Sequence, residues 1–351
     1  MMSPHKILIS SDKIKNTNSG LGRVAVDFNS ALIGAVSSDI TVSFLVSGKP
    51  VHEILVNQNT EIVNPWKRYF PHYLKKYDLF HATYQGPSYK IKGAKKTVLT
   101  IHDLNFLFTK SEKKQKKQLR RIQSNVNDAD AIVFISNYTY QICSKHLHIP
   151  ENKIIKIIYN GVQMPTCQPQ RPLWLPDSPY FFSIGQFLEK KNFHSLLPFI
   201  KNLKGYSMVI AGDNATGYGK KMKESVTLLG LGERVILSGP VSEAEKLYLY
   251  QNCEAFFVPS IAEGFGLPVI EAMNAGRPVF CSDQTSLTEI GDKHAFYWDS
   301  FEPEAMLTIF NKGMNQFTDQ ARDEAILYSQ RFTWEQNVKE YLELYRQLLG
   351  K

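Results

Sequence analysis

Short apolar runs alternate with longer amphipathic segments along the first half of the chain. Apolar, β-branched runs predict buried strands at 5–10, 40–46, 78–82, 97–101, 130–135 and 154–158. Helical periodicity of apolar positions predicts helices at 23–36, 112–126 and 137–146. Continuously apolar strands separated by helices are typical of a parallel sheet that is covered on both faces.

The alternation stops at 165–179, where five prolines in fifteen residues exclude a helix or a central strand and predict a linker. Beyond the linker, strands are predicted at 180–184, 208–211, 234–238, 255–258, 278–281 and 295–298. Helices are predicted at 193–203, 242–251, 267–275 and, with an apolar stripe on one face, 334–349.

These patterns predict an α/β protein with two Rossmann-like, doubly wound domains facing a cleft, which would hold the ligand site. The predicted parts are an N-terminal domain at 1–164, the linker at 165–179, a second domain at 180–333 and a C-terminal helical segment at 334–351. We expect the last segment to pack back toward the N-terminal domain.

Composition and charge narrow the classes of protein. With 43% hydrophobic and 21% charged residues, the 351-residue chain is expected to fold rather than to be disordered. No apolar run approaches the roughly 20 residues that span a bilayer, and four scattered cysteines form neither a disulfide framework nor a zinc motif. Residues 1–164 hold 23 Lys and Arg against 11 Asp and Glu, which indicates that this half meets something anionic.

The segment 259–273 contains the strongest candidate chemistry. Glu263 precedes the predicted helix and Glu271 lies about one turn inside it. The glycines between them let the backbone approach a ligand closely, and a helix N-terminus presents N–H groups. Carboxylates only accept hydrogen bonds, which suits a hydroxyl-rich ligand better than a phosphate. The alternative is an ordinary strand–loop–helix turn with two solvated glutamates.

Three weaker signals also follow predicted strands. Lys190 and Lys191 lie at a loop–helix junction that favours an anion, or they are solvated on a surface turn. Gly20 and Gly22 permit close approach of a phosphate, although a lone Gly-x-Gly also fits an ordinary turn. His102, beside Asp103, would bind sugar hydroxyls or stabilise charge, or it is a hydrogen-bonded structural residue.

In their order and spacing these motifs resemble the retaining glycosyltransferases of family 4 (glycosyl transferases group 1), which have the GT-B fold. The resemblance extends from Gly20-Leu21-Gly22 to Phe332-Thr333-Trp334 and is densest at 181–299, where Glu263 and Glu271 match the Glu-x7-Glu signature of the family. It implies that the protein is an enzyme whose domain at 1–164 binds the acceptor and whose domain at 180–333 binds a nucleotide-sugar donor.

The resemblance implies a role for single residues. Glu271 would bind the ribose, Glu263 the sugar hydroxyls, and Lys190 and Lys191 the diphosphate; Lys190 stands where the family commonly has an arginine. The other implied contacts are His102 beside the transferred sugar, Gly22 over the donor phosphates, Gly20 toward the acceptor, and the backbone of Phe265, Gly266 and Leu267 at the donor sugar.

The function implied is transfer of a hexose, with retention, to a glycan or lipid-linked acceptor in bacterial-type polysaccharide or O-antigen synthesis. The stretch 101–104 looks like that of mannosyltransferases, so GDP-mannose is the first candidate donor and a UDP-hexose the next. No metal and no cofactor are expected, because the lysines supply the positive charge. The alternatives are a GT-B-fold nucleotide-sugar epimerase and a non-catalytic nucleotide-sugar-binding protein.

Seven basic residues crowd into the twelve positions 110–121. Those expected to face an acceptor or lipid are Lys113, Lys114, Lys116, Lys117, Arg120 and Arg121. With no recognised nucleic-acid module, an anionic membrane surface is the better functional interpretation, and a solvated helix face is the alternative. The protein is thus expected to be cytoplasmic and peripheral at the inner face of the plasma membrane. Asp128 and Asp130 resemble a metal-binding DxD motif but fit a helix–strand boundary better.

Overall fold

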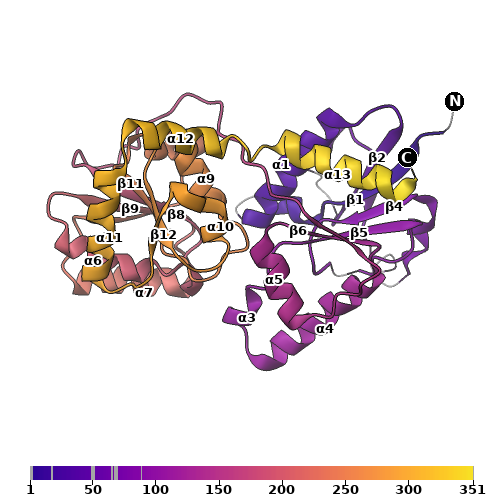
Figure 1. The fold of residues 1–351 in the computed structure, drawn as a ribbon, viewed down its shortest axis with the longest axis horizontal. Helices are drawn as coiled ribbons and strands as arrows, with labels where there is room; N and C mark the ends of the chain where they lie inside the picture. The colour runs from indigo at the N-terminus through magenta and orange to yellow at the C-terminus, as the bar shows by residue number, and fades with distance from the viewer. Residues whose placement is uncertain are drawn as a thin grey trace. The chain divides into compact units, whose positions relative to one another are not determined.

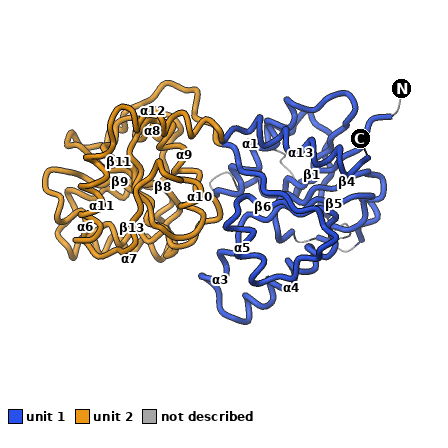
Figure 2. The backbone as a smooth tube through the Cα atoms, viewed as in Figure 1, with its two compact units in different colours: residues 1–161, 332–351 blue, residues 162–331 orange. Residues whose placement is uncertain are grey.

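The computed structural model describes residues 3–16, 19–48, 52–64, 66, 70–87 and 89–350. The chain forms two compact units (Figure 2). Unit 1 consists of Met1–Gly161 and Phe332–Lys351, and unit 2 of Val162–Arg331. Each unit is built on one parallel sheet with helices, so the predicted α/β class with two doubly wound domains is confirmed.

Unit 1 has a seven-stranded sheet in the order β3-β2-β1-β4-β5-β6-β7, and all its paired strands are parallel. The strands are β1 (His5–Ser10), β2 (Ile40–Val46), β3 (Thr60–Ile62), β4 (Leu79–Ala82), β5 (Lys96–Ile101), β6 (Ala131–Phe134) and β7 (Ile154–Ile157). The α-helices are α1 (Gly20–Ala35), α3 (Phe106–Thr109), α4 (Glu112–Asp128), α5 (Asn137–His146) and α13 (Trp334–Leu349). Short 3-10 helices lie at η1 (Asp12–Lys15), η2 (Glu53–Leu55) and η3 (Pro71–Lys76).

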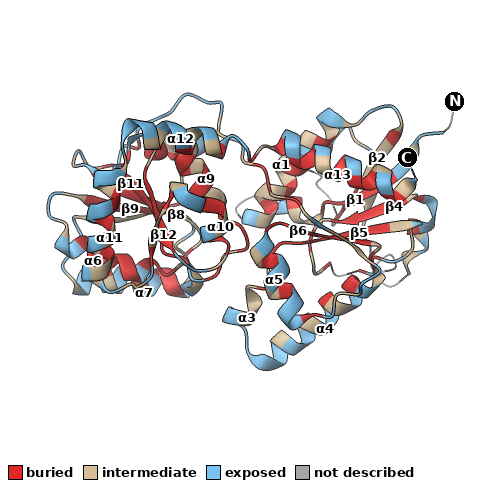
Figure 3. Ribbon diagram, viewed as in Figure 1, coloured by how far each residue is buried: buried red, intermediate tan, exposed pale blue. Residues whose placement is uncertain are grey.

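Helices cover both faces of this sheet (Figure 1). Successive strand residues point to opposite faces. Thus Ile7 and Ile9 pack with α1 and α13, whereas Leu8 packs with α4 and α5. The buried residues lie along the strands and on the inward faces of these helices (Figure 3).

The last helix, α13, belongs to unit 1 although unit 2 precedes it in the chain. Its buried face joins the core beside α1, and its bounds agree with the predicted 334–349. Gly161 allows a close approach there, because a Cβ atom on it would lie 2.4 Å from the backbone nitrogen of Trp334.

Unit 2 has a six-stranded parallel sheet in the order β10-β9-β8-β11-β12-β13. The strands are β8 (Tyr180–Ile184), β9 (Ser207–Ala211), β10 (Val235–Gly239), β11 (Ala255–Val258), β12 (Val279–Ser282) and β13 (Phe296–Trp298). The α-helices are α6 (Leu196–Asn202), α7 (Gly217–Leu228), α8 (Glu243–Asn252), α9 (Leu267–Asn274), α10 (Leu287–Gly291), α11 (Pro303–Gln316) and α12 (Asp319–Ser329). Short 3-10 helices lie at η4 (Glu189–Lys191), η5 (Phe193–Ser195) and η6 (Asp292–His294).

The proline-rich segment 165–179 packs as part of unit 2 rather than standing apart as a linker. Leu175 is buried, and the backbone nitrogen of Gln170 donates to the carbonyl of Ala244 at 3.0 Å. The prolines prevent regular secondary structure, as predicted, but they do not prevent irregular backbone from packing on a sheet domain.

Candidate functional site

The loops after β8 and β11 meet because these strands are parallel neighbours whose carboxyl ends lie at one edge of the sheet. Lys191, in the first loop, places its Nζ 2.5 Å from Oε1 of Glu263 in the second. The backbone nitrogen of Ile261 also donates to the carbonyl of Lys190 at 2.8 Å. The structure therefore brings together Lys190, Lys191 and Glu263, which the sequence suggested as separate motifs.

The Lys191–Glu263 pair is largely shielded from water, with side chains only 14% and 12% exposed. Burial by itself raises the pKa of Glu263, but the positive charges of Lys191 and Lys190 outweigh it and hold that pKa below its usual value. Glu263 is thus a carboxylate at neutral pH, able to accept hydrogen bonds from hydroxyl groups.

Glycines shape the backbone under this pair. Gly212 follows β9 with φ +128°, and a Cβ atom on it would lie 2.0 Å from the carbonyl oxygen of Gly185. A Cβ atom on Gly185 would in turn lie 3.1 Å from Cε of Lys191. Only residues without side chains let these two strand ends approach while the Lys191 side chain crosses them.

The start of α9 carries the residues expected at the donor sugar. Gly266 precedes the helix with φ +115°, and a Cβ atom added to it would lie 2.9 Å from Cδ2 of Leu287. The hydroxyl of Ser286 donates to the carbonyl of Phe265 at 2.8 Å, which steadies the loop. The helix begins at Leu267, where first-turn N–H groups lack a carbonyl partner within the helix.

Glu271, on α9, is held by two residues of α8. The hydroxyl of Tyr250 donates to Oε2 at 2.7 Å, and Nζ of Lys246 lies 3.4 Å from Oε1. The Glu271 side chain is 16% exposed, so neither it nor Glu263 is a solvated surface glutamate. Lys246 and Tyr250 were not predicted; their spacing of four on one helix face is the only signal of them in the sequence.

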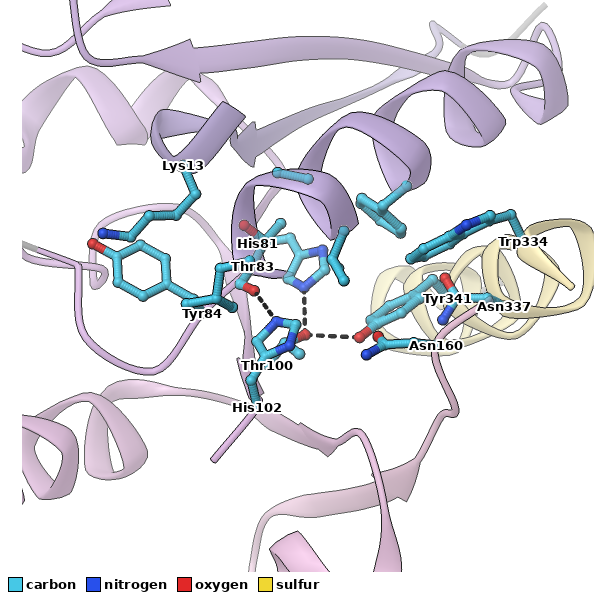
Figure 4. A pocket seen from close by; sticks show the side chains of 14 residues that line it. Lys13, His81, Thr83, Tyr84, Thr100, His102, Asn160, Trp334, Asn337 and Tyr341 are labelled. Carbon is cyan, nitrogen blue, oxygen red and sulfur yellow. Dashed lines mark hydrogen bonds between the residues drawn. The ribbon is translucent and has the colours of Figure 1, made fainter. Parts of the chain in front are cut away.

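Unit 1 contains a pocket at the carboxyl ends of β4 and β5 (Figure 4). The residues that line it are Lys13, Leu21, Val24, Ala25, Phe28, His81, Thr83, Tyr84, Thr100, His102, Asn160, Trp334, Asn337 and Tyr341. His102 is buried there and donates from Nε2 to the carbonyl of Thr83 at 2.8 Å. Burial lowers the pKa of His102 and outweighs the bond to Thr83 and the charge of Asp103, which both raise it, so the ring is neutral. Because Nε2 carries the proton that is donated to Thr83, Nδ1 is left as an acceptor.

A buried polar chain ties α13 to the strands beneath His102. His81 bonds to Thr100 through Nε2 at 2.8 Å and to the hydroxyl of Tyr345 through Nδ1 at 2.6 Å. Thr100 bonds in turn to the hydroxyl of Tyr341 at 2.8 Å. Burial, with a smaller effect of His102, lowers the pKa of His81 to about 3.

The low pKa of His81 predicts that the folded protein loses stability in acid. Because the pKa of His81 is about 3 in the folded protein and about 6.5 in an unfolded chain, the unfolded state binds more protons between these values. Full stability is therefore expected above pH 6.5, with progressive loss as the pH falls toward 3. Thermal unfolding from pH 7 to pH 4 should show this slope, and His81→Gln should flatten it while lowering stability overall. Parallel curves for the two proteins would refute the assignment.

Gly20 and Gly22 lie in the first turn of α1, which begins three residues earlier than the predicted 23–36. The side chain of Ser19 caps this turn by accepting from the nitrogen of Gly22 at 3.1 Å. Asp103, the acidic neighbour of His102, accepts at Oδ1 from the backbone nitrogen of Asn105 at 2.9 Å. That bond gives Asp103 a role in the local turn.

The basic run lies along α4, where its side chains are exposed: Lys113, Lys114, Lys116, Lys117, Arg120 and Arg121. Asp130 accepts from the backbone nitrogen of Thr97 at 2.8 Å, as fits a helix–strand boundary. Among the described residues, no group of three or more His, Cys, Asp or Glu side chains could hold a metal ion. No helix in the described ranges is long and apolar enough to cross a membrane.

Comparisons with known proteins agree with this architecture. The model of the glycosyl transferases group 1 matches residues 168–307, and that of glycosyltransferase family 4 matches 43–164. O-antigen chain mannosyltransferase B of Escherichia coli is 23% identical over 98% of this chain and 100% of its own. O-antigen chain mannosyltransferase RfbU of Salmonella typhimurium is 29% identical over 57% of this chain and 55% of its own. Anabaena HepE in complex with UDP-glucose superposes with a TM-score of 0.75 at 19% identity, covering 96% of this chain and 99% of that one.

Two Rossmann-like units of this kind define a GT-B protein, and GT-B is the fold of the structural neighbours. The two family models together cover most of the chain, and the relative that matches over 98% of it is named a mannosyltransferase. The chain belongs to the family 4 type glycosyltransferases, and it is a glycosyltransferase enzyme.

Proposed function

We propose that the protein transfers a hexose, mannose before others, from a nucleotide-sugar to a hydroxyl of a glycan or lipid-linked acceptor in bacterial O-antigen or polysaccharide synthesis. The relatives named as O-antigen mannosyltransferases support the sugar and the pathway. GDP-mannose is therefore the first donor to test and a UDP-hexose the second. The observation that carries the proposal is the shielded Lys191–Glu263 pair beside Lys190.

The pair explains how the site changes its partners when the donor binds. Without donor, Lys191 and Glu263 neutralise each other. An arriving diphosphate offers Lys191 and Lys190 phosphate oxygens in place of the carboxylate, which leaves Glu263 to accept hydrogen bonds from the sugar hydroxyls. Glu271, oriented by Tyr250 and Lys246, accepts from the ribose.

Retention follows if acceptor and leaving group use one face of the sugar. The bond from the anomeric carbon to the diphosphate breaks, the bond from that carbon to the acceptor oxygen forms, and the acceptor proton passes to the departing phosphate. Lys190 and Lys191 stabilise the charge that develops on the diphosphate. His102, neutral and buried, contacts the transferred sugar without itself carrying charge.

The test is release of nucleoside diphosphate from GDP-mannose with and without a glycan acceptor, followed by NMR of the anomeric proton in the product. The proposal predicts acceptor-dependent release and a product with the anomeric configuration of the donor. Conversion of the donor without acceptor indicates the epimerase alternative, and binding without any conversion indicates the non-catalytic one. An inverted product would reject retention.

We further propose that transfer needs no metal ion, because Lys190 and Lys191 supply the charge that Mg²⁺ or Mn²⁺ would otherwise bring to the diphosphate. Activity is expected to be unchanged by excess EDTA. Loss of activity in EDTA that Mn²⁺ restores would overturn this proposal and would make Asp128 and Asp130 candidate metal ligands.

We also propose that α4 attaches the protein to the inner face of the plasma membrane. All seven basic side chains of the run are exposed, as is Phe108 just before it. Each basic residue near an anionic leaflet contributes about 1 kcal/mol, and screening limits the field to about 8 Å at physiological salt. The protein is expected to sediment with anionic liposomes at low salt and less at high salt.

Two variants with equal charge changes separate this attachment from a general effect of charge. Changing Lys113, Lys114, Lys116 and Lys117 to glutamine should abolish sedimentation. The same change at four exposed lysines of unit 2, Lys201, Lys204, Lys220 and Lys223, should leave it intact. If the first variant pellets as the wild type does, the run is only a solvated helix face.

A further inference from the structure

The pocket of unit 1 contains polar groups that the protein itself does not satisfy. Trp334 and Asn337 reach it from the start of α13, opposite His102 and Thr83 (Figure 4). Within the described part of the chain, the indole nitrogen of Trp334 and Oδ1 of Asn337 are buried without a hydrogen-bond partner. The two residues are only 4% and 3% exposed, so these atoms do not form hydrogen bonds with bulk water.

The orientation of the Asn337 amide follows from its other contact. Its Nδ2 donates to the carbonyl of Tyr159 at 2.6 Å. Because a carbonyl only accepts, the amide nitrogen must be the atom at Tyr159, which leaves Oδ1 as the unused acceptor. Leaving a buried donor or acceptor unmet costs about 1–3 kcal/mol, so these two atoms call for a hydrogen-bonding partner from outside the chain.

The chemistry of the lining selects the kind of group. The Trp334 indole offers one N–H donor and Asn337 one acceptor, and neither is charged. An anion would face the carbonyl oxygen of Asn337 and a cation the N–H of Trp334, whereas a hydroxyl both donates and accepts. Among the described residues of the lining, the one ammonium is that of Lys13, which lies over the Tyr84 ring at 4.3 Å from its centre. The pocket therefore suits a neutral, hydroxyl-bearing ligand.

We propose that this pocket is an acceptor subsite in which a hydroxyl or hydroxymethyl group of a neutral sugar binds between the Trp334 N–H and Oδ1 of Asn337. The proposal rests on the proposed transfer to a glycan, because His102, expected beside the transferred sugar, lines the same pocket. The C-terminal helix thereby has a binding role in addition to its packing on α1.

The test observes the indole N–H signals of the four tryptophans in the full-length, ¹⁵N-labelled protein. Methyl α-D-mannopyranoside is the probe, and Trp334→Phe identifies the Trp334 signal while keeping an aromatic ring in place. Saturable movement of the Trp334 signal is expected, with the buried Trp298 of unit 2 unmoved. Backbone amides of α13 should report an apparent Kd about 3- to 10-fold weaker in Trp334→Phe, as for loss of one hydrogen bond.

Two controls address structure and chemistry. Trp298→Phe makes the same substitution at a buried indole of unit 2, outside the pocket, and should bind the probe as the wild type does. The ring without hydroxyls, 2-methoxytetrahydropyran, should not move the signal. If the mannoside leaves the wild-type Trp334 signal unmoved, or if Trp334→Phe binds it as tightly as the wild type, the pocket holds only water and the proposal falls.

This experiment involves neither donor nor turnover. A mannoside-dependent shift together with no acceptor-dependent release from any nucleotide-sugar would reject the proposed function and retain the subsite. Transfer activity together with an unmoved Trp334 signal would reject the subsite and retain the proposed function.

Discussion

Glu263→Gln is expected to lose both turnover and stability. Turnover should fall about 10- to 150-fold, as for loss of a charged hydrogen bond to the reacting sugar. The substitution also leaves the ammonium of Lys191 in a site where its side chain is only 14% exposed. Removing one partner of a buried ion pair destabilises by about 3–5 kcal/mol, so the free energy of unfolding should fall by a comparable amount.

The double variant Lys191→Met, Glu263→Gln separates the two effects. With both charges removed, no unpaired ammonium remains, and most of the lost stability should return. Turnover should stay low, because the diphosphate has lost a positive charge and the sugar a carboxylate. Wild-type kinetics in Glu263→Gln, or a double variant as active as the wild type, would contradict the assignment of this pair to the donor site.

Gly212→Ala is expected to destabilise unit 2 by about 3 kcal/mol or more and to weaken donor binding. The new Cβ atom would lie 2.0 Å from the carbonyl oxygen of Gly185, and φ at this position is +128°. Backbone strain and overpacking each cost about 1–3 kcal/mol. Because relief requires movement of the Gly185 backbone, which lies under Lys191, the ammonium should move away from the diphosphate position.

Gly205→Ala is the matched control for this glycine. Gly205 also has a positive φ, +84°, but nothing lies within 4 Å of its Cβ position. Its substitution should therefore show backbone strain without crowding, and donor affinity should be unchanged. Chemical denaturation and donor titration of both variants decide the matter. Equal effects at the two positions would mean that the close contact of Gly185 and Gly212 is unimportant.

The strands were predictable because buried parallel strands are short, continuous apolar runs. The bounds of β1, β2, β8 and β11 agree with those predicted. The structure adds β3 (Thr60–Ile62), whose three residues are too few to show a pattern. It also adds α7, which begins with Gly217-Tyr218-Gly219 and so lacks a sequence typical of a helix start. The Thr216 hydroxyl caps this helix by accepting from the backbone nitrogen of Gly219 at 2.9 Å.

The site was predictable only in part. Motif spacing identified Glu263 and Lys191, but 72 residues separate them, and only the adjacency of β8 and β11 brings them into contact. Tyr250 and Lys246 escaped prediction because they look like ordinary positions of a helix until α8 packs beside α9. In the sequence, Trp334 looks like one more apolar position of α13. Only the folded structure shows that its indole N–H is buried at a pocket without a hydrogen-bond partner.

The central claim is that unit 2 holds a nucleotide-sugar through its lysines and its two glutamates. The most direct measurement is the thermal unfolding midpoint of the wild type and of Glu271→Ala in a series of nucleotide-sugars that includes GDP-mannose and UDP-glucose. A donor at 100 times its Kd adds about 2.7 kcal/mol of stability. We predict that one donor, GDP-mannose first, raises the wild-type midpoint, and that Glu271→Ala needs about 10- to 150-fold more of it for the same rise. A wild type that no nucleotide-sugar stabilises, or a Glu271→Ala variant stabilised equally well, would contradict the account.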